Sequence, residues 1–136
     1  MKPVISHIAE SALYVDDLDR AVTFYTGLFE WPVLLRDDRF AVLRITPQQV
    51  LLLFRRGASL EPATLPGGTV PAHDGNGQLH ICFGISADEL TCWEEILRAQ
   101  GITVESRVRW PSNAASLYFR DPDQNAVELA TPGVFE

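Results

Sequence analysis

The sequence has little cysteine, little lysine and no long apolar run. It contains two cysteines, Cys82 and Cys92, in 136 residues, which is too few for the disulfide framework of a small secreted domain. The longest apolar run, residues 50–54, is far short of the roughly 20 residues that a membrane-spanning helix requires. The first residues contain no apolar stretch of signal-peptide length. These absences predict a cytoplasmic protein that does not insert into membranes.

Basic residues are also scarce. Eleven Lys and Arg face eighteen Asp and Glu, which gives a net charge of −7, and no basic run is longer than Arg55-Arg56. Nucleic acids and anionic membranes are therefore not expected partners, because both require a concentrated positive surface. The 46% hydrophobic and 21% charged residues are typical of a globular protein, and the length fits one domain with a substantial core.

The same order of predicted elements occurs twice along the chain. In the first half, a strand (10–15) precedes a helix (17–29) and three strands (33–36, 39–45 and 49–54). In the second half, a strand (79–85) precedes a helix beginning after Ser86 and three strands (103–110, 116–119 and 126–130). Ser86 and Glu89 have the spacing of a capping box. The repeat predicts an α+β fold of two βαβββ modules.

We expect one domain spanning residues 1–136, with module one at 5–57 and module two at 78–132. The segment 58–77 between them is rich in Gly and Pro and has no periodicity, so it is predicted to be a loop. A long loop inside a small domain is often functional, for example as a lid.

One carboxylate stands out near the end of the chain. Asp121 and Pro122 have the spacing of a type I turn, which predicts a hairpin with the following strand at residues 126–130. Glu128 lies in that otherwise apolar strand. A carboxylate among small and apolar neighbours is costly unless a cation or hydrogen-bond donors meet it.

The repeat supplies two partners for Glu128. When the helix starts are aligned, Glu10 corresponds to His80, and Glu128 corresponds to Leu52. Because strand side chains alternate, Glu10 and His80 lie on the face opposite the apolar residues that pack on the helices. If the two sheets curl toward each other, Glu10, His80 and Glu128 converge. Two carboxylates and one imidazole suit a divalent cation with open coordination positions, which polarises a bound oxygen.

Two stretches resemble the vicinal oxygen chelate superfamily, which includes glyoxalase I, extradiol dioxygenases, fosfomycin thiol transferases and bleomycin-binding proteins. Residues 13–25 are similar to its strand-helix start, and residues 118–129 are similar to its Tyr-Phe-x-Asp-Pro-Asp ending. The resemblance implies a cupped, half-open barrel around a metal, with ligand positions that fall on Glu10, His80 and Glu128. It also implies a homodimer.

The sequence departs from the family pattern at three places. Glu10 stands where His or Gln is usual, which argues against an extradiol dioxygenase. Leu52 stands where a first-module glutamate is usual, which argues against a standard glyoxalase I. Gln124-Asn125 replaces a Gly-containing pair. The remaining three-ligand set is similar to that of fosfomycin thiol transferases, and Ser116 and Tyr118 lie where those enzymes place hydroxyls against a phosphonate.

The sequence therefore predicts a metal-dependent enzyme of the lyase, isomerase or transferase type, acting on a small oxygen-bearing metabolite. The ion is expected to be Zn, Ni, Mn or Fe, held by Glu10, His80 and Glu128, with Glu10 or Glu128 as catalytic base. The expected substrate-binding residues are Trp110, Ser116, Tyr118 and Arg109. The alternative is a metal-free protein that sequesters a small molecule, as the bleomycin-binding members do.

Overall fold

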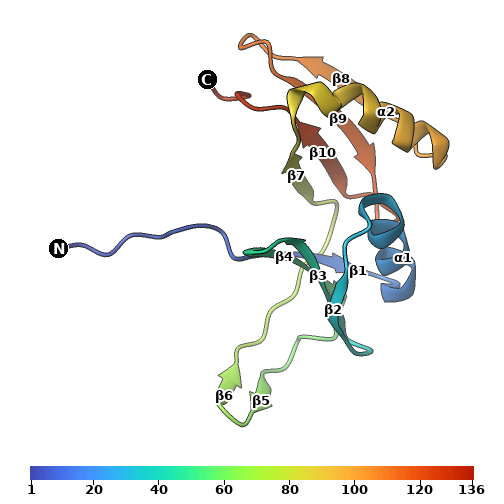
Figure 1. Cartoon of the computed structure of the whole chain (residues 1–136). Coiled ribbons are helices and arrows are strands. Elements are labelled where there is room, and N and C mark those ends of the chain that lie inside the picture. Colours follow the sequence, from blue (N-terminus) through green and yellow to red (C-terminus); the bar gives the residue numbers. More distant parts are fainter. The chain divides into compact units, whose positions relative to one another are not determined.

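The computed structural model describes residues 1–136, which form two compact units, Met1–Asn76 and Gly77–Glu136. Each unit contains a four-stranded sheet and a helix in the order βαβββ (Figure 1). The predicted α+β fold of two βαβββ modules is confirmed.

In the first unit, one helix packs on a mixed sheet. Its elements are β1 (Glu10–Val15), α1 (Leu18–Phe29), β2 (Val33–Arg36), β3 (Phe40–Thr46) and β4 (Gln49–Arg55). The strand order is β1-β4-β3-β2, with β1 parallel to β4 and the other pairs antiparallel. Leu13 and Val15 are buried while Glu10 is exposed, as the alternation predicted. The helix buries an apolar stripe of Leu18, Ala21, Val22, Tyr25 and Leu28.

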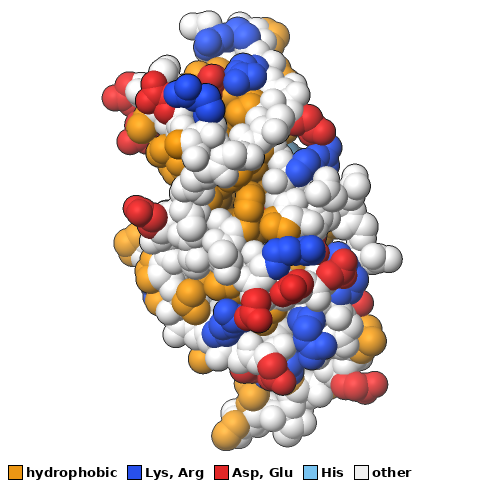
Figure 2. Space-filling model, turned by 90° about the vertical axis from the view of Figure 1, so that its right-hand side faces the viewer, with side chains coloured by type: hydrophobic (Ala, Val, Ile, Leu, Met, Phe, Trp, Pro, Cys, Tyr) orange, Lys and Arg blue, Asp and Glu red, His pale blue; other side chains and the backbone are white.

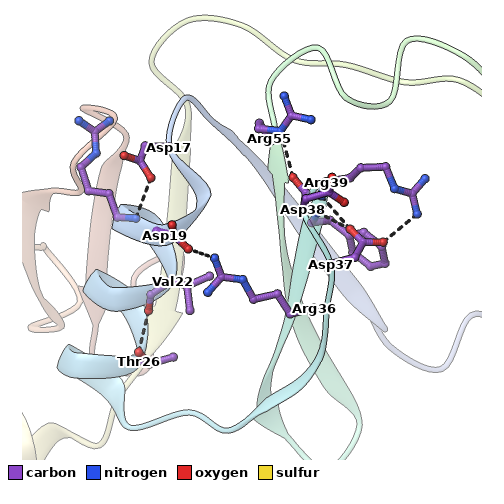
Figure 3. A network of polar contacts seen from close by, with 11 residues as sticks. Asp17, Asp19, Val22, Thr26, Arg36, Asp37, Asp38, Arg39 and Arg55 are labelled. Atoms are coloured by element: carbon purple, nitrogen blue, oxygen red, sulfur yellow. Dashed lines mark hydrogen bonds and ion pairs between the residues drawn. The ribbon is translucent and has the colours of Figure 1, made fainter.

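Carboxylates fix the start of α1 and the β2–β3 turn (Figure 3). Asp17 is the N-cap of α1, and its side chain accepts a hydrogen bond from the backbone N–H of Arg20. Asp19 pairs with Arg36 at the end of β2, which links helix and sheet across the exposed surface. Asp37 accepts from the backbone N–H groups of Arg39 and Phe40, so its side chain closes the turn between β2 and β3.

The segment 58–77, predicted to be a loop, contains a short hairpin. Its strands are β5 (Ala63–Leu65) and β6 (Gly68–Val70), joined by Pro66-Gly67. Each strand has three residues, too few to produce a detectable alternation.

Backbone contacts attach the end of this segment to the first unit. The N–H of His73 donates to the carbonyl of Ser59 at 2.9 Å, and Arg56 Nε donates to the carbonyl of Gly75 at 3.2 Å. A Cβ on Gly75 would lie 2.2 Å from the ring of Tyr14, so only glycine fits there without a shift.

The second unit repeats the arrangement. Its elements are β7 (His80–Gly84), a 3₁₀ turn η1 (Ala87–Glu89), α2 (Leu90–Ala99), β8 (Ser106–Arg109), β9 (Ala115–Arg120) and β10 (Ala126–Ala130). The strand order is β7-β10-β9-β8, with β7 parallel to β10. In Figure 1, α2 lies along this sheet.

The predicted capping box at Ser86 is wrong. The Ser86 side chain makes no cap hydrogen bond, because the Glu89 N–H donates to the backbone carbonyl of Ser86 at 3.0 Å instead. This bond closes the 3₁₀ turn that leads into α2. At the other end of the helix, Gly101 has φ +70°, a left-handed conformation that glycine adopts without strain.

The two sheets have the same register at their parallel strand pairs. Ala12 lies opposite Leu52 in the first unit, and Cys82 lies opposite Glu128 in the second. Leu52 and Glu128 thus occupy equivalent places in the two modules.

The turn between β9 and β10 is organised by two buried polar residues. Gln124 N–H donates to the carbonyl of Asp121 at 3.0 Å, as a type I turn requires. Asp121 Oδ1 accepts from the backbone N–H groups of Asp123 and Asn125. Asn125 is fully buried; its Nδ2 donates to Asp121 Oδ2, and its Oδ1 accepts from the N–H of Leu79 at 2.8 Å. The turn is thereby attached to the residue that precedes β7.

Neither helix has the length and apolar character needed to cross a membrane. Figure 2 shows acidic and basic side chains lying next to one another on one face, without a broad region of positive charge.

Replacing Asn125 by Ala is expected to destabilise the protein by about 2 to 4 kcal/mol, because it leaves the N–H of Leu79 and an oxygen of Asp121 without their buried partner. Urea unfolding followed by tryptophan fluorescence measures this. Gln48→Ala, at an exposed turn, is the control and should change stability by less than about 0.5 kcal/mol. Equal effects of the two substitutions would contradict the role of Asn125.

Candidate functional site

Glu128 lies at the centre of a polar cluster on one face of the second sheet. Strand β10 runs between β7 and β9, and its register places Cys82 on one side of Glu128 and Tyr118 on the other. His80 and Ser116 lie two residues from Cys82 and Tyr118 along the same strands, so they point to the same face. Glu128 is only 6% exposed. A carboxylate this buried needs hydrogen-bond donors or a cation.

His80 faces Glu128 with one defined ring nitrogen. Its Nδ1 lies 2.9 Å from the backbone carbonyl of Ala126, and its Nε2 lies 3.3 Å from Glu128 Oε2. A carbonyl only accepts hydrogen bonds, so Nδ1 carries the proton. When the ring is protonated, Nε2 carries the proton of an ion pair with Glu128; in the neutral ring, its lone pair is free to bind a cation placed next to the carboxylate. This is the tautomer and the backbone anchor that metal-ligating histidines commonly have.

Hydrogen bonds keep Glu128 ionised. Burial alone would raise its pKa, but hydrogen bonds from Ser116, Tyr118 and Cys82, together with the nearby His80, lower the pKa of Glu128 overall. Desolvation, and then the hydrogen bond to Glu128, raise the pKa of the half-buried Tyr118 to about 12, and they raise the pKa of the thiol of Cys82 to about 12 as well, although that residue is exposed at the surface. The phenol and the thiol therefore act as protonated donors to the carboxylate.

A pocket of about 650 Å³ opens over this cluster, a size that suits a small molecule. The C-terminal residues 131–135 form one side of it. Its other walls include His80, Cys82, Trp110, Tyr118 and Glu128.

The second unit thus brings together five predicted site residues. They are His80, Trp110, Ser116, Tyr118 and Glu128. Ser116 does not line the pocket; it is buried, accepts a hydrogen bond from Trp110, and is the diagonal neighbour of Glu128 across the β9–β10 pair. Arg109 is not among the pocket walls; its Nη1 donates to the carbonyl of Asn113 within the β8–β9 turn.

Glu10 belongs to the first unit. It is exposed at the start of β1 and lines a separate pocket of about 360 Å³. Within each unit, no three His, Cys, Asp or Glu side chains are grouped to hold a metal. Two of the three predicted ligands, His80 and Glu128, are adjacent. That Glu10 completes a metal site with them stays a prediction.

The pocket of the first unit was not predicted from the sequence. Phe40 and Phe54, directly paired in β3 and β4, stack with ring centroids 5.6 Å apart, and His73 meets Phe54 edge-on at 4.6 Å. The hydroxyl of Tyr14 lies 2.7 Å from Nδ1 of His73 and holds that ring in place. The sequence offered one indication of this pocket, a phenylalanine in each of two neighbouring strands. It did not predict that His73 joins them, because the position of His73 depends on the path of the segment after β6.

Known proteins share this fold and sequence pattern. The model of the Glyoxalase/Bleomycin resistance protein/Dioxygenase superfamily matches residues 4–129. The metallothiol transferase FosB of Bacillus licheniformis is 29% identical over 133 residues, which cover 97% of this chain and 77% of that protein. The crystal structure of lactoylglutathione lyase from Agrobacterium tumefaciens is 34% identical, with a TM-score of 0.87 and 98% of each chain covered. A glyoxalase/bleomycin resistance protein/dioxygenase from Nocardioides is 26% identical, with a TM-score of 0.73, over 97% of this chain and 91% of that one.

The raised pKa of Cys82 predicts slow alkylation. A thiol whose pKa rises from 9.0 to about 12 has about a thousandfold less thiolate at pH 8, and the thiolate is the reactive form. Glu128→Gln removes the negative charge beside the thiol, so alkylation of Cys82 by iodoacetamide should accelerate about tenfold or more. Peptide mass spectrometry follows both cysteines, and Cys92 on α2 is the internal reference. If Glu128→Gln leaves the alkylation rate of Cys82 unchanged, the inferred contact between the Cys82 thiol and the Glu128 carboxylate is wrong.

Proposed function

Because the chain belongs to the Glyoxalase/Bleomycin resistance protein/Dioxygenase superfamily, the vicinal oxygen chelate superfamily indicated by its sequence, we propose that it is a metal-dependent enzyme acting on a small oxygen-bearing metabolite. The observation that carries the proposal is the pair of His80 and Glu128. The Nδ1 of His80 is hydrogen-bonded to a backbone carbonyl, and its Nε2 lies next to an ionised carboxylate. An imidazole oriented in this way beside a carboxylate is a common pair of metal ligands.

The donor set fits a divalent ion such as Zn, Ni, Mn or Fe. His80 would contribute Nε2, Glu128 one carboxylate oxygen, and Glu10 a second carboxylate. The name metallothiol transferase attributes a metal to one relative, which supports this proposal. When bound, the ion supplies a Lewis acid that polarises an oxygen of the substrate.

The chain's own residues then have distinct tasks. Glu128 is itself buried and is surrounded by side-chain donors, so it serves best as a fixed ligand. Glu10 is exposed, so of the two carboxylate ligands it is the one that we propose can leave the ion and take a proton from the substrate. Tyr118 lines the second pocket and keeps its proton, so we propose that its hydroxyl donates to Glu128 and that its oxygen can accept a hydrogen bond from a substrate.

The relatives named above suggest two reaction types, a lyase and a transferase. Leu52 occupies the place in the first unit that Glu128 has in the second, so this chain has no carboxylate for a fourth, symmetric ligand. A three-ligand set favours the transferase type.

Metal analysis tests the proposal. Protein purified without chelators should carry about one divalent ion per site, and adding Zn, Ni, Mn or Fe to the metal-free protein at 100 times its Kd should stabilise it by about 2.7 kcal/mol. Glu128→Gln, His80→Ala and Glu10→Gln should each weaken metal binding by about 100-fold or more. Glu95→Gln, at an exposed position of α2, is the matched control.

Absence of stoichiometric metal, together with no stabilisation by any of the four ions, would overturn the enzyme proposal. The alternative, a metal-free protein that sequesters a small molecule, would then hold. Loss of metal binding in Glu128→Gln and His80→Ala but not in Glu10→Gln would remove Glu10 from the ligand set.

We also propose that the chain forms a homodimer in the cytoplasm. Large apolar side chains are exposed, with Ile5 at 91% and Leu35 at 57%, and burying such groups favours self-association. Both cysteines are free, in keeping with a reducing compartment. Light scattering at micromolar concentration should give about 30 kDa, twice the 15.1 kDa of one chain. A mass of one chain at that concentration would contradict the dimer.

A further inference from the structure

We propose that Trp110 and Ser116 are positioning residues for Glu128: the indole N–H of Trp110 fixes the hydroxyl of Ser116, and this hydroxyl fixes the carboxylate. This inference rests on the proposed metal site. It gives Ser116 and Trp110, both predicted to bind substrate, a different task.

The chemistry of the two groups sets the direction of the hydrogen bonds. Trp110 Nε1 lies 2.8 Å from Ser116 Oγ, and an indole N–H only donates. Ser116 is therefore the acceptor, and its own proton points elsewhere. Ser116 is 1% exposed, so bulk water does not receive that proton. Glu128 is the acceptor on the adjoining strand. The register pairs Ser116 with Ala130 and Tyr118 with Glu128, so Ser116 is the diagonal neighbour of Glu128 on the same face of the sheet. The lowered pKa of Glu128 agrees with a hydrogen bond from this hydroxyl.

The β8–β9 turn holds Trp110 at its backbone. The N–H of Trp110 donates to the carbonyl of Ala114 at 2.8 Å, and the carbonyl of Trp110 accepts from the N–H of Asn113 at 2.9 Å. The Arg109 side chain also donates to the carbonyl of Asn113 at 3.0 Å. Both the N–H and the carbonyl of Trp110 are therefore hydrogen-bonded. These bonds fix the backbone from which the indole side chain extends.

Ser116 differs from the other donors around Glu128. Tyr118 and Cys82 line the pocket, so a bound ligand can reach and move them. Ser116 is almost fully buried and is not among the residues that line the pocket, so a substrate does not reach it. It is thus the donor that fixes one oxygen of Glu128 whatever occupies the pocket. A ligand held in one orientation binds a metal more tightly than one that must be ordered on binding.

The test measures affinity for Zn²⁺ alone, by competition with a chromophoric chelator. Ser116→Ala is expected to weaken Zn²⁺ binding by about 10- to 100-fold, and Trp110→Phe, which keeps a ring but removes the N–H, by about tenfold. Because the two residues act in series, the double variant should be no weaker than Ser116→Ala. Ser116→Thr, which keeps the hydroxyl, should retain affinity close to that of the unmodified protein. Trp93→Phe on α2 is the matched control and should leave affinity unchanged.

The outcomes separate this inference from the proposed function. If the unmodified protein binds no Zn²⁺, the proposed metal site fails first. If it binds Zn²⁺ and Glu128→Gln abolishes binding, but Trp110→Phe and Ser116→Ala bind normally, the site stands and the positioning role is wrong. If the losses of Zn²⁺ affinity in the two single variants add up in the double variant, Trp110 does not act through Ser116. The positioning role would also be wrong if each variant that loses Zn²⁺ affinity also lowers the melting temperature of the metal-free protein, because the loss would then reflect a damaged fold.

Discussion

The burial of one carboxylate is the constraint on which the second unit depends. Glu128 is 6% exposed on an inner strand of its sheet, and the register with β7 and β9 places Cys82, Tyr118 and Ser116 around it as donors. A slip of one residue in either pairing would turn those side chains to the other face and leave the charge without partners. The same register that builds the sheet therefore builds the site.

The repeat shows how one scaffold carries two kinds of surface. Leu52 and Glu128 have equivalent places in their sheets, yet the first unit surrounds its position with Phe40, Phe54 and His73. The first pocket is thus mainly aromatic and apolar, and the second is a hydrogen-bonded carboxylate site. Function depends on which residues occupy the positions, since the two folds are alike.

Local patterns predicted the elements, and long-range contacts decided what the sequence did not predict. The turn residues and the apolar run located β10 at residues 126–130, and the repeat matched Glu128 with Leu52. The Ser86 cap failed because a backbone carbonyl took the amide, and the β5–β6 hairpin was too short to leave a pattern. The hydrogen bond from Trp110 to Ser116 depends on the geometry of the β8–β9 turn, which the sequence pattern did not predict. The meeting of Glu10 with His80 remains a prediction.

The surroundings of Glu128 also bear on how it would meet a cation. Its Oε2 lies 3.3 Å from Nε2 of His80, so one carboxylate oxygen and one imidazole nitrogen already stand side by side. The lowered pKa of Glu128 keeps the carboxylate ionised despite its burial, because neighbouring side chains stabilise the charge. The neighbours that make the buried charge tolerable therefore also keep it available to a cation.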